Sequence, residues 1–285
     1  MKICYLILIH HKFEQAKRLI NQLANSQTCF VIHIDAKVDQ ATYERFKQDM
    51  VTISSIHYSK RIDVKWGAFS LTKAIMETIL HAVSSDVIKC DRYMLISGQD
   101  YPIVSNQAIS NFIETHQTEE FIEAVLLDLT DDKTKVWTPF YRFIRYHFWV
   151  GKKRISTALI KKNPPNIPIY HGSAWWLLTS KSIEYLADVY IHNKKINRFF
   201  STSFMSDEAY IQTLLMSSPF STNIVGRSLT YTNWENASGA HPKTLTKDDI
   251  AKINTSNCLF ARKLDTDLDI EIFNLLDLQK INQFN

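Results

Sequence analysis

A chain of 285 residues, of which 45% are hydrophobic, can bury a sizeable core, and its six glycines and seven prolines exclude low-complexity sequence. The formal net charge of +4 is too small to indicate nucleic-acid binding, although it suits an anionic ligand such as a nucleoside diphosphate. No apolar run reaches the roughly 18 residues that span a bilayer, and the apolar N-terminus is too short for a signal peptide. We therefore expect a cytoplasmic protein.

The first 60 residues alternate between buried strands and amphipathic helices. Apolar runs predict strands at 3–9, 30–34 and 54–58, and helical spacing of apolar residues predicts helices at 12–25 and 40–50. This alternation is typical of a parallel βαβαβ unit, the nucleotide-binding half of a Rossmann-like α/β fold. The G-x-G-x-x-G fingerprint is absent, which argues against an NAD enzyme of the usual type.

A fourth buried strand is predicted at 93–97, after a helix that runs from about 66 to 83. Ser97 and Gly98 end this strand, and Asp100 lies just beyond it. Ligands of open α/β sheets bind outside the carboxyl ends of the strands, so Asp100 is a candidate for ligand binding. An aspartate at this place also suits a simple turn.

The remaining chain is less regular. We predict further strands at 121–125 and 229–231, and helices at 106–116, 181–193, 207–216, from 247 and from 268. The segment 128–166 is rich in Lys, Arg and aromatic residues and lacks clean periodicity. We interpret it as a substrate-facing insertion in one domain, 1–285, rather than an independent domain.

Two groups of residues have competing interpretations. Five basic residues of the insertion predict a solvated helix face. The alternative is that they contact a membrane surface beside a lipid-linked acceptor. These residues are Lys152, Lys153, Arg154, Lys161 and Lys162. The four cysteines have no C-x-x-C spacing, which favours buried free thiols in a reducing compartment over zinc or redox chemistry. They are Cys4, Cys29, Cys90 and Cys258, and all but Cys90 lie in apolar runs expected to be strands.

Eight stretches, in this order, together resemble the core-2/I-branching β-1,6-N-acetylglucosaminyltransferase family, which includes peptide O-xylosyltransferases. They are HIDAK (33–37), VKWG (64–67) with Ser70, ISGQDYPI (96–103), GSAWW (172–176), SDE (206–208), NW (233–234), HPKT (241–244) and LFARK (259–263). The resemblance covers about residues 3 to 270. It implies a GT-A-type glycosyltransferase fold, with residues 1–127 forming mainly the donor-binding half and 128–285 the acceptor-binding and catalytic half.

The resemblance also implies the chemistry. Glu208 matches the family's catalytic base, which accepts the proton of the attacking acceptor hydroxyl. Read without the resemblance, Ser206 would cap a helix with Asp207 and Glu208 in its first turn. The family neutralises the leaving diphosphate with basic side chains rather than a metal; Lys263 matches one of them, and Lys243 is the best match for the other, with His241 as the fallback.

The ends of the first strands should recognise the donor, because His10, Asp35 and Lys37 follow strands one and two. The full set of donor-site candidates is His10, Asp35, Lys37, Asp63, Trp66, Asp100, Lys243, Arg262 and Lys263. For the acceptor, Trp234 matches a family aromatic that stacks on the sugar, and the other candidates are Asp207, Tyr141, Arg142 and Arg145. Strand alternation should divide Trp175 and Trp176 between cleft and core.

We therefore expect an inverting, metal-independent transferase that moves a sugar, most plausibly N-acetylglucosamine, from a UDP-sugar to a glycan acceptor. No cofactor or nucleic-acid partner is expected, and membrane contact is at most peripheral. Three alternatives stay open. One is xylosyl transfer, and another is a non-catalytic carbohydrate-binding protein. The third is a metal-dependent enzyme that uses Asp265, Asp267 and Asp269, although acids at the start of the last helix also suit caps.

Overall fold

The computed structural model describes residues 1–85, 88–128, 130, 138–151, 153–161, 167–235 and 241–282. Its centre is a sheet with the strand order β10-β4-β1-β2-β3. Strands β1 (Ile3–Ile9), β2 (Thr28–Ile34), β3 (Ile56–Tyr58) and β4 (Arg92–Ser97) run parallel, and β10 (Leu177–Thr179) pairs antiparallel with β4. The predicted fold class, a mostly parallel sheet flanked by helices, is confirmed.

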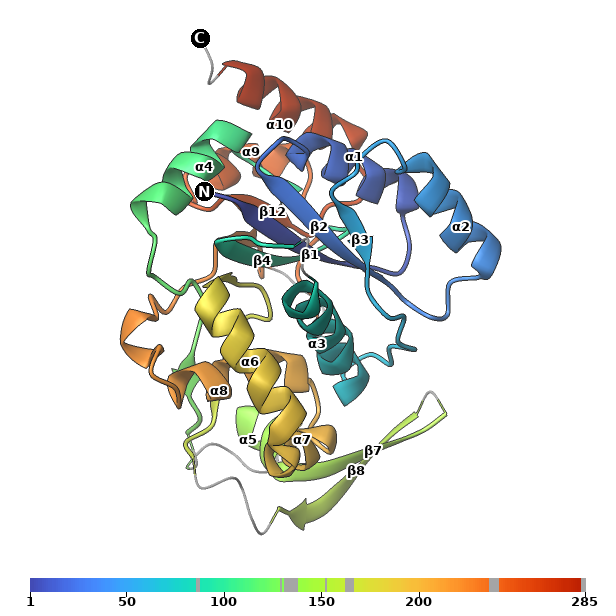
Figure 1. Ribbon diagram of the computed structural model, residues 1–285. Coiled ribbons are helices and arrows are strands. Elements are labelled where there is room, and N and C mark those ends of the chain that lie inside the picture. The colour runs from blue at the N-terminus through green and yellow to red at the C-terminus, as the bar shows by residue number, and fades with distance from the viewer. Residues whose placement is uncertain are drawn as a thin grey trace.

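The side chains of β1 alternate between two cores. Ile3, Tyr5 and Ile7 point into one core, which α1 (Phe13–Leu23), α2 (Gln40–Asp49), α4 (Asn106–Thr115) and α10 (Ile270–Asn282) help to form. Cys4, Leu6 and Leu8 point into the other. That core is shared with α3 (Phe69–Ser84), α6 (Ser180–His192) and α8 (Tyr210–Met216). The sheet is therefore covered on both faces (Figure 1), which explains why its strands are apolar throughout.

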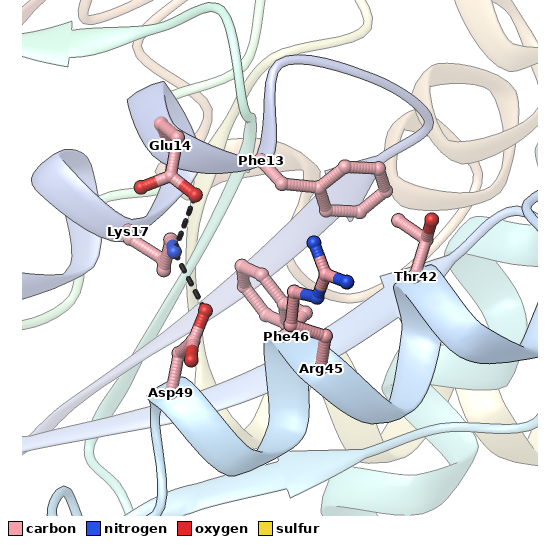
Figure 2. Close-up of a pocket in the computed structure, with 7 residues that line it drawn as sticks. All are labelled: Phe13, Glu14, Lys17, Thr42, Arg45, Phe46 and Asp49. Atoms are coloured by element: carbon pink, nitrogen blue, oxygen red, sulfur yellow. Dashed lines mark hydrogen bonds and ion pairs between the residues drawn. The ribbon is translucent and has the colours of Figure 1, made fainter.

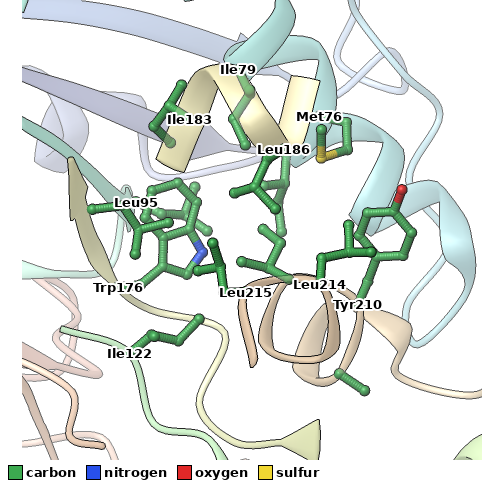
Figure 3. Packing of buried hydrophobic residues seen from close by; sticks show 14 of the residues in the cluster. Met76, Ile79, Leu95, Ile122, Trp176, Ile183, Leu186, Tyr210, Leu214 and Leu215 are labelled. Carbon is green, nitrogen blue, oxygen red and sulfur yellow. The ribbon is translucent and has the colours of Figure 1, made fainter. Parts of the chain in front are cut away.

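The second of these cores is closed by Trp176, which is fully buried. Figure 3 shows its indole among Leu95 of β4, Leu186 of α6 and Leu215 of α8. Trp175, by contrast, is only partly buried, and the Arg262 guanidinium lies 4.1 Å from its ring centre. The two tryptophans thus differ in burial, as the alternation of side chains along an extended segment predicts, and a place for Trp175 in a ligand cleft stays a prediction.

A small second sheet brings the last third of the chain to the carboxyl end of β4. Its order is β11-β12-β5, with β12 (Phe260–Arg262) parallel to β11 (Thr230–Thr232) and antiparallel to β5 (Tyr101–Pro102). Short helical turns, η3 (Lys247–Asp249) and α9 (Ile250–Asn254), connect β11 to β12. This arrangement places Arg262 beside Asp100, 162 residues earlier in the chain.

The insertion contains a helix and a β-hairpin. Helix α5 (Pro139–Ile144) leads into β7 (Arg145–Val150), which pairs antiparallel with β8 (Lys153–Ile160). The predicted solvated helix face is therefore wrong. Lys161 is buried, and its ammonium donates to the carbonyls of Phe143 and Phe199 at 2.9 Å and to Ser203 Oγ at 2.7 Å. Lys152 and Lys162 lie outside the described residues.

Two other expectations need correction, and two elements were not predicted. The strand at 121–125 is wrong, because Phe121 makes only an isolated bridge to Leu177, and the two-residue β6 (Val125–Leu126) pairs instead with β9 (Tyr170–His171). The helix at 207–216 is a 3₁₀ turn, η1 (Ser206–Glu208), followed by α8. The two elements that were not predicted from the sequence are α7 (Lys194–Ser201) and the short 3₁₀ turn η2 (Ser221–Asn223).

Two further expectations concern free cysteine thiols and membrane-spanning segments. All four cysteines are free, although Cys258 precedes β12 rather than lying in a strand. In the described parts of the chain, none of the helices has the length and apolar character that crossing a bilayer requires.

Candidate functional site

Four of the predicted donor-site residues meet where β1 and β2 end. Asp35 accepts a hydrogen bond from the Lys37 backbone N–H at 2.9 Å, and its carboxylate lies 3.2 Å from the Lys37 ammonium, which is 3.9 Å from Asp63. His10 stacks on His11, with ring centres 4.0 Å apart. Burial, followed by the charge of His11, lowers the pKa of His10 to about 4. Its imidazole is therefore neutral at pH 7 and can both donate and accept hydrogen bonds.

The end of β12 supplies two cations. Arg262 donates to Asp100 Oδ1 at 3.0 Å, and Asp100 is fully buried and also accepts from the Ser97 backbone N–H. Asp100 therefore holds Arg262 in place rather than presenting an open carboxylate. Lys263 is different, because no carboxylate among the described residues lies within 4.0 Å of its ammonium.

Lys263 lies close to the end of β1. Burial, together with the Arg262 charge, lowers the pKa of Lys263, and the Lys263 charge in turn lowers the pKa of His10, His11 and His241. A cation that is partly desolvated and unpaired by carboxylates is suited to receive an anionic ligand.

The HPKT motif divides between two roles. The Lys243 ammonium lies 3.0 Å from both carboxylate oxygens of buried Asp249, which also accepts from Asn233. Burial, together with the charges of Lys263 and Arg262, lowers the pKa of His241, and its ring centre lies 5.6 Å from that of half-exposed Trp66. This position favours the fallback, His241, over Lys243 for the donor site, and the donor role of either residue stays a prediction.

Glu208 ends η1, which the left-handed Met205 (φ 55°) introduces. Ser206 makes no capping bond there; its hydroxyl lies 2.8 Å from that of Thr72 on α3. The Glu208 side chain is 28% exposed, and Oε2 accepts a hydrogen bond from Arg142. Burial raises the pKa of Glu208, and the positive charge of Arg142 opposes that rise.

Asp207 has a more enclosed position. Its side chain is buried, and Oδ1 has no hydrogen-bond partner among the described residues. Burial, together with the neighbouring Glu208 charge, raises the pKa of Asp207 to about 7. The two adjacent carboxyl groups therefore differ: Glu208 is partly exposed and paired with a cation, and Asp207 is enclosed.

The acceptor candidates lie in different surroundings. Arg142 of α5 contacts Glu208 directly, whereas Tyr141 is buried and its ring lies beneath the Arg145 guanidinium at 5.1 Å. Trp234 is exposed in the loop after β11. Sequence reasoning placed Arg142 near the acceptor but did not predict that it pairs with Glu208.

Sequence reasoning also missed Glu123. Its carboxylate accepts from the Ser173 backbone N–H at 3.0 Å, and its charge contributes to raising the pKa of Glu208. The signal was Gly172 in the GSAWW motif. A Cβ at Gly172 would lie 2.3 Å from the Glu123 carbonyl oxygen, so the close approach of the two segments requires glycine.

The acids that would serve a metal-dependent enzyme have other partners. Lys12 donates to Asp265 at 2.7 Å and also to Asp267. Asp269 accepts from the Glu271 backbone N–H at 2.9 Å in the first turn of α10, the capping role that the sequence allows. The described residues contain no group of three or more His, Cys, Asp or Glu side chains that could hold a metal ion.

A surface hollow between α1 and α2 lies apart from these residues. Figure 2 shows Lys17 there, with its ammonium 2.5 Å from Glu14 and 2.7 Å from Asp49. None of the predicted site residues lines this hollow, so it does not alter the site described above. Its lining residues are Phe13, Glu14, Lys17, Thr42, Arg45, Phe46 and Asp49.

Comparisons with known proteins agree with the motifs. Xylosyltransferase 2 of Mus musculus is 22% identical over 97% of this chain and 33% of its own length. Xylosyltransferase 1 of Rattus norvegicus is 23% identical over 97% of this chain and 35% of its own length. The chain thus spans about a third of these relatives. A solved structure of 4-diphosphocytidyl-2C-methyl-D-erythritol synthase from Anaerococcus prevotii is 10% identical and covers 90% of this chain and 95% of its own, with a TM-score of 0.40.

The family model described as "Core-2/I-Branching enzyme" matches residues 3–257, which is most of the chain and includes the SDE turn, the GSAWW motif and the HPKT motif. The chain belongs to the core-2/I-branching enzyme family.

Proposed function

We propose that this chain is an inverting glycosyltransferase that moves N-acetylglucosamine from UDP-N-acetylglucosamine to a hydroxyl of a glycan acceptor, forming a β linkage without a metal. The observation that carries the proposal is the position of Glu208. Its partly exposed carboxylate is close enough to Arg262 for the Arg262 charge to act on its pKa. A candidate base and a candidate leaving-group cation therefore lie near each other.

In this reaction the acceptor hydroxyl attacks the anomeric carbon of the donor sugar as Glu208 accepts its proton. The bond between that carbon and the β-phosphate oxygen breaks, and the bonding electrons leave with UDP. A carboxylate with a raised pKa accepts a proton more readily at neutral pH, and burial raises the pKa of Glu208 in this direction. Attack from the face opposite the leaving group inverts the anomeric configuration.

Lys263 and Arg262 would meet the negative charge that develops on the diphosphate. Arg262 is oriented by buried Asp100, so it enters the reaction without having to be ordered. Lys263 is the more available cation, since no described carboxylate pairs with it. Fixed cations of this kind stabilise charge more in the transition state than in the ground state, and that difference is what accelerates the reaction.

The uridine would lie at the ends of β1 and β2. His10, neutral at pH 7, and Asp35 can hydrogen-bond a uracil ring and ribose hydroxyls, and half-exposed Trp66 offers an aromatic face beside His241. Exposed Trp234 would stack on the acceptor sugar, and Arg142 would orient the base through its hydrogen bond to Glu208.

Xylosyl transfer is the second candidate, because the curated relatives cited above are named xylosyltransferases. Xylose lacks the hydroxymethyl group and the N-acetyl group of N-acetylglucosamine, so the same base and cations would serve both donors. The discrimination would then rest on the shape of the sugar pocket.

The test is calorimetry and UDP release with UDP-N-acetylglucosamine, UDP-xylose, UDP-glucose and GDP-mannose, first alone and then with glycan acceptors. We expect UDP-N-acetylglucosamine to bind most tightly and to turn over. Preference for UDP-xylose would establish the second candidate. Glycan binding with no affinity for any nucleotide sugar would instead identify a non-catalytic carbohydrate-binding protein and overturn both candidates.

A further inference from the structure

The charge of this chain is unevenly distributed along the sequence. Residues 133–183 contain ten of the 33 Lys and Arg residues and none of the 29 Asp and Glu residues. The rest of the chain therefore has 23 basic residues against 29 acidic ones. A protein with a formal net charge of only +4 thus concentrates its positive charge in the segment 133–183, and a field of one sign attracts an anionic surface.

The structure builds part of this basic segment into the β7–β8 hairpin, which projects from the body of the molecule (Figure 1). One face of the hairpin packs on the protein. The His147 backbone N–H donates to the Thr202 carbonyl at 2.9 Å, and the Arg154 guanidinium lies 3.6 Å from the ring centre of Phe204. The ring of His147 also lies 5.8 Å from that of Phe204, so the inner face packs on the segment that precedes η1.

The opposite face is apolar and open. Phe148 and Ile155 are cross-strand partners with 46% and 50% of their surfaces exposed, and Val150, 65% exposed, is paired with exposed Lys153 at the tip. Tyr146 extends the apolar face, with its ring stacked 6.2 Å from that of Phe148. Single exposed apolar residues are ordinary on protein surfaces, but several on one face of a two-stranded ribbon indicate an interaction site.

We propose that this outward face, formed by Tyr146, Phe148, Val150, Lys153 and Ile155, docks on a lipid bilayer that contains anionic phospholipid. Aliphatic and aromatic side chains can enter the boundary between headgroups and acyl chains, and exposed Lys153 on the same face is attracted to lipid phosphates, as is the net positive charge of residues 133–183. Duplex nucleic acid would match the charge but would leave Val150 and Ile155 without a partner, so the bilayer is the better match.

Docking in this orientation has a consequence for the proposed transferase. The inner face of the hairpin holds the segment 202–204, which leads within four residues to Glu208. The candidate site would then be held beside the bilayer, where a lipid-linked glycan acceptor can reach it. This consequence depends on the proposed function, whereas the docking itself does not.

The test is sedimentation of the full chain with phosphatidylcholine vesicles, with and without phosphatidylglycerol. We expect binding only to the anionic vesicles. Replacing the outward apolar residues together, Phe148→Ser, Val150→Ser and Ile155→Ser, should lower the partition coefficient at least about tenfold, since apolar insertion and charge attraction contribute jointly. A matched variant with Val51→Ser, Ile191→Ser and Leu278→Ser, all exposed apolar positions elsewhere, should bind like wild type.

A second variant tests the charge without changing the apolar face. Lys153→Glu should weaken binding to anionic vesicles, while Lys2→Glu, an exposed lysine at the start of the chain, should not. The proposal is overturned if the wild type ignores anionic vesicles, if the triple hairpin variant binds as well as wild type, or if labelled duplex DNA displaces the vesicles. UDP release from a soluble donor should be unchanged in the triple variant, so a failure here is distinguishable from a failure of the proposed function.

Discussion

Two adjacent carboxyl groups in this chain have different surroundings, and the difference decides which can act as a base. Glu208 is partly exposed and is held by Arg142, so it can face an acceptor hydroxyl and become ionised again after each turnover. Asp207 is enclosed with an unpartnered oxygen, which favours the protonated form. Because an acceptor hydroxyl must come within hydrogen-bond distance of the base, the buried Asp207 is the poorer candidate.

Glu208→Gln should therefore keep the fold and the UDP affinity but lower the transfer rate about 10²–10⁴-fold, the usual contribution of general base catalysis. The amide is nearly isosteric and can still accept a hydrogen bond from Arg142, but it cannot take up the hydroxyl proton. Single-turnover rates and calorimetry with UDP provide the two measurements. Asp207→Asn should slow the chemical step less, and near wild-type transfer by purified Glu208→Gln would show that the base lies elsewhere.

Lys263 can be tested through the affinity for the product nucleotide. Lys263→Ala should weaken UDP binding roughly ten- to hundredfold and slow the chemical step, because a charge-assisted contact to a diphosphate contributes about 1.5–3 kcal/mol. Lys263→Arg should restore part of both. Lys243→Ala is the matched control: its ammonium pairs with Asp249, so we expect a smaller effect on UDP binding. Unchanged UDP affinity in Lys263→Ala would place Lys263 outside the donor site.

Lys161 predicts a pH dependence of stability. Burial lowers its pKa to about 7, and the group binds a proton more weakly in the folded chain than in the unfolded one. Between that value and the ordinary lysine pKa the unfolded state holds more protons, so stability must rise with pH. We expect a gain of roughly 1–2 kcal/mol in the free energy of unfolding from pH 7 to 8.5, measured by urea denaturation.

The control for this prediction is Lys161→Met, which removes the titrating group while keeping a similar volume. The variant leaves the carbonyls of Phe143 and Phe199 without the ammonium that they share, so it should be less stable at every pH. The informative quantity is the slope with pH. A slope identical to that of wild type would mean that another group titrates.

At the scale of elements, one junction links the hairpin, α3 and the turn that carries Glu208. Gly67 lies just before α3 with φ +69°, and its carbonyl accepts from the Met205 backbone N–H at 2.7 Å. A Cβ at this position would lie 2.3 Å from a ring atom of Phe204, which also packs on Arg154 and Trp66. The orientation of η1 therefore depends on a residue without a side chain 141 positions earlier in the sequence.

Gly67→Ala should destabilise the fold by about 2–4 kcal/mol, because a left-handed backbone and a steric overlap act together. Gly151→Ala isolates the first contribution, since Gly151 has φ +59° and nothing within 4 Å of the added Cβ. It should cost only about 1–2 kcal/mol. Thermal unfolding of both variants gives the comparison, and equal losses would show that Phe204 moves aside without cost.

The elements that sequence predicts well are those with local signals. Strand β1 is continuous and apolar because both of its faces are buried, and α1 has clear helical spacing, so both are recognised from their own residues. The hairpin was missed although Gly151, with φ +59°, lies at its turn, because the segments on either side lack clean apolar alternation. Buried Lys161 was also misjudged, because its three acceptors lie in segments distant in sequence.

At the scale of the whole molecule, the candidate site combines residues from position 10 to position 263. The carboxyl ends of parallel strands place His10 and Asp35 together, and the topology alone predicts that meeting. The roles of Glu208 and Lys263 came from the resemblance to a family. Neither the topology nor the resemblance predicted the contacts of Glu208 with Arg142 and of Arg262 with Asp100. Each contact joins two elements that are far apart in the sequence, and no local sequence pattern indicates that such elements lie side by side.

The distribution of cations and acids over the molecule gives the last prediction. The acids that a metal-dependent transferase would use are paired with the protein's own cations, Asp100 with Arg262 and both Asp265 and Asp267 with Lys12. Lys263, by contrast, has no carboxylate partner among the described residues and lies near His10 and His241. In the proposed mechanism, side chains would thus supply the positive charge at the donor site.

We therefore expect sugar transfer to proceed at an unchanged rate in excess EDTA and to gain nothing from added manganese, measured as UDP release from the preferred donor. Lys12→Ala sharpens the test, because it removes the cation that neutralises Asp265 and Asp267. A hard divalent ion prefers several carboxylate oxygens, and Lys12→Ala leaves those of Asp265 and Asp267 without their cation. A dependence on manganese that appears in Lys12→Ala but not in the wild type would therefore be a result of the substitution. Loss of wild-type activity in EDTA, restored by manganese, would mean that a metal meets the charge of the leaving diphosphate and would redirect attention to Asp100 and the acids at 265–269.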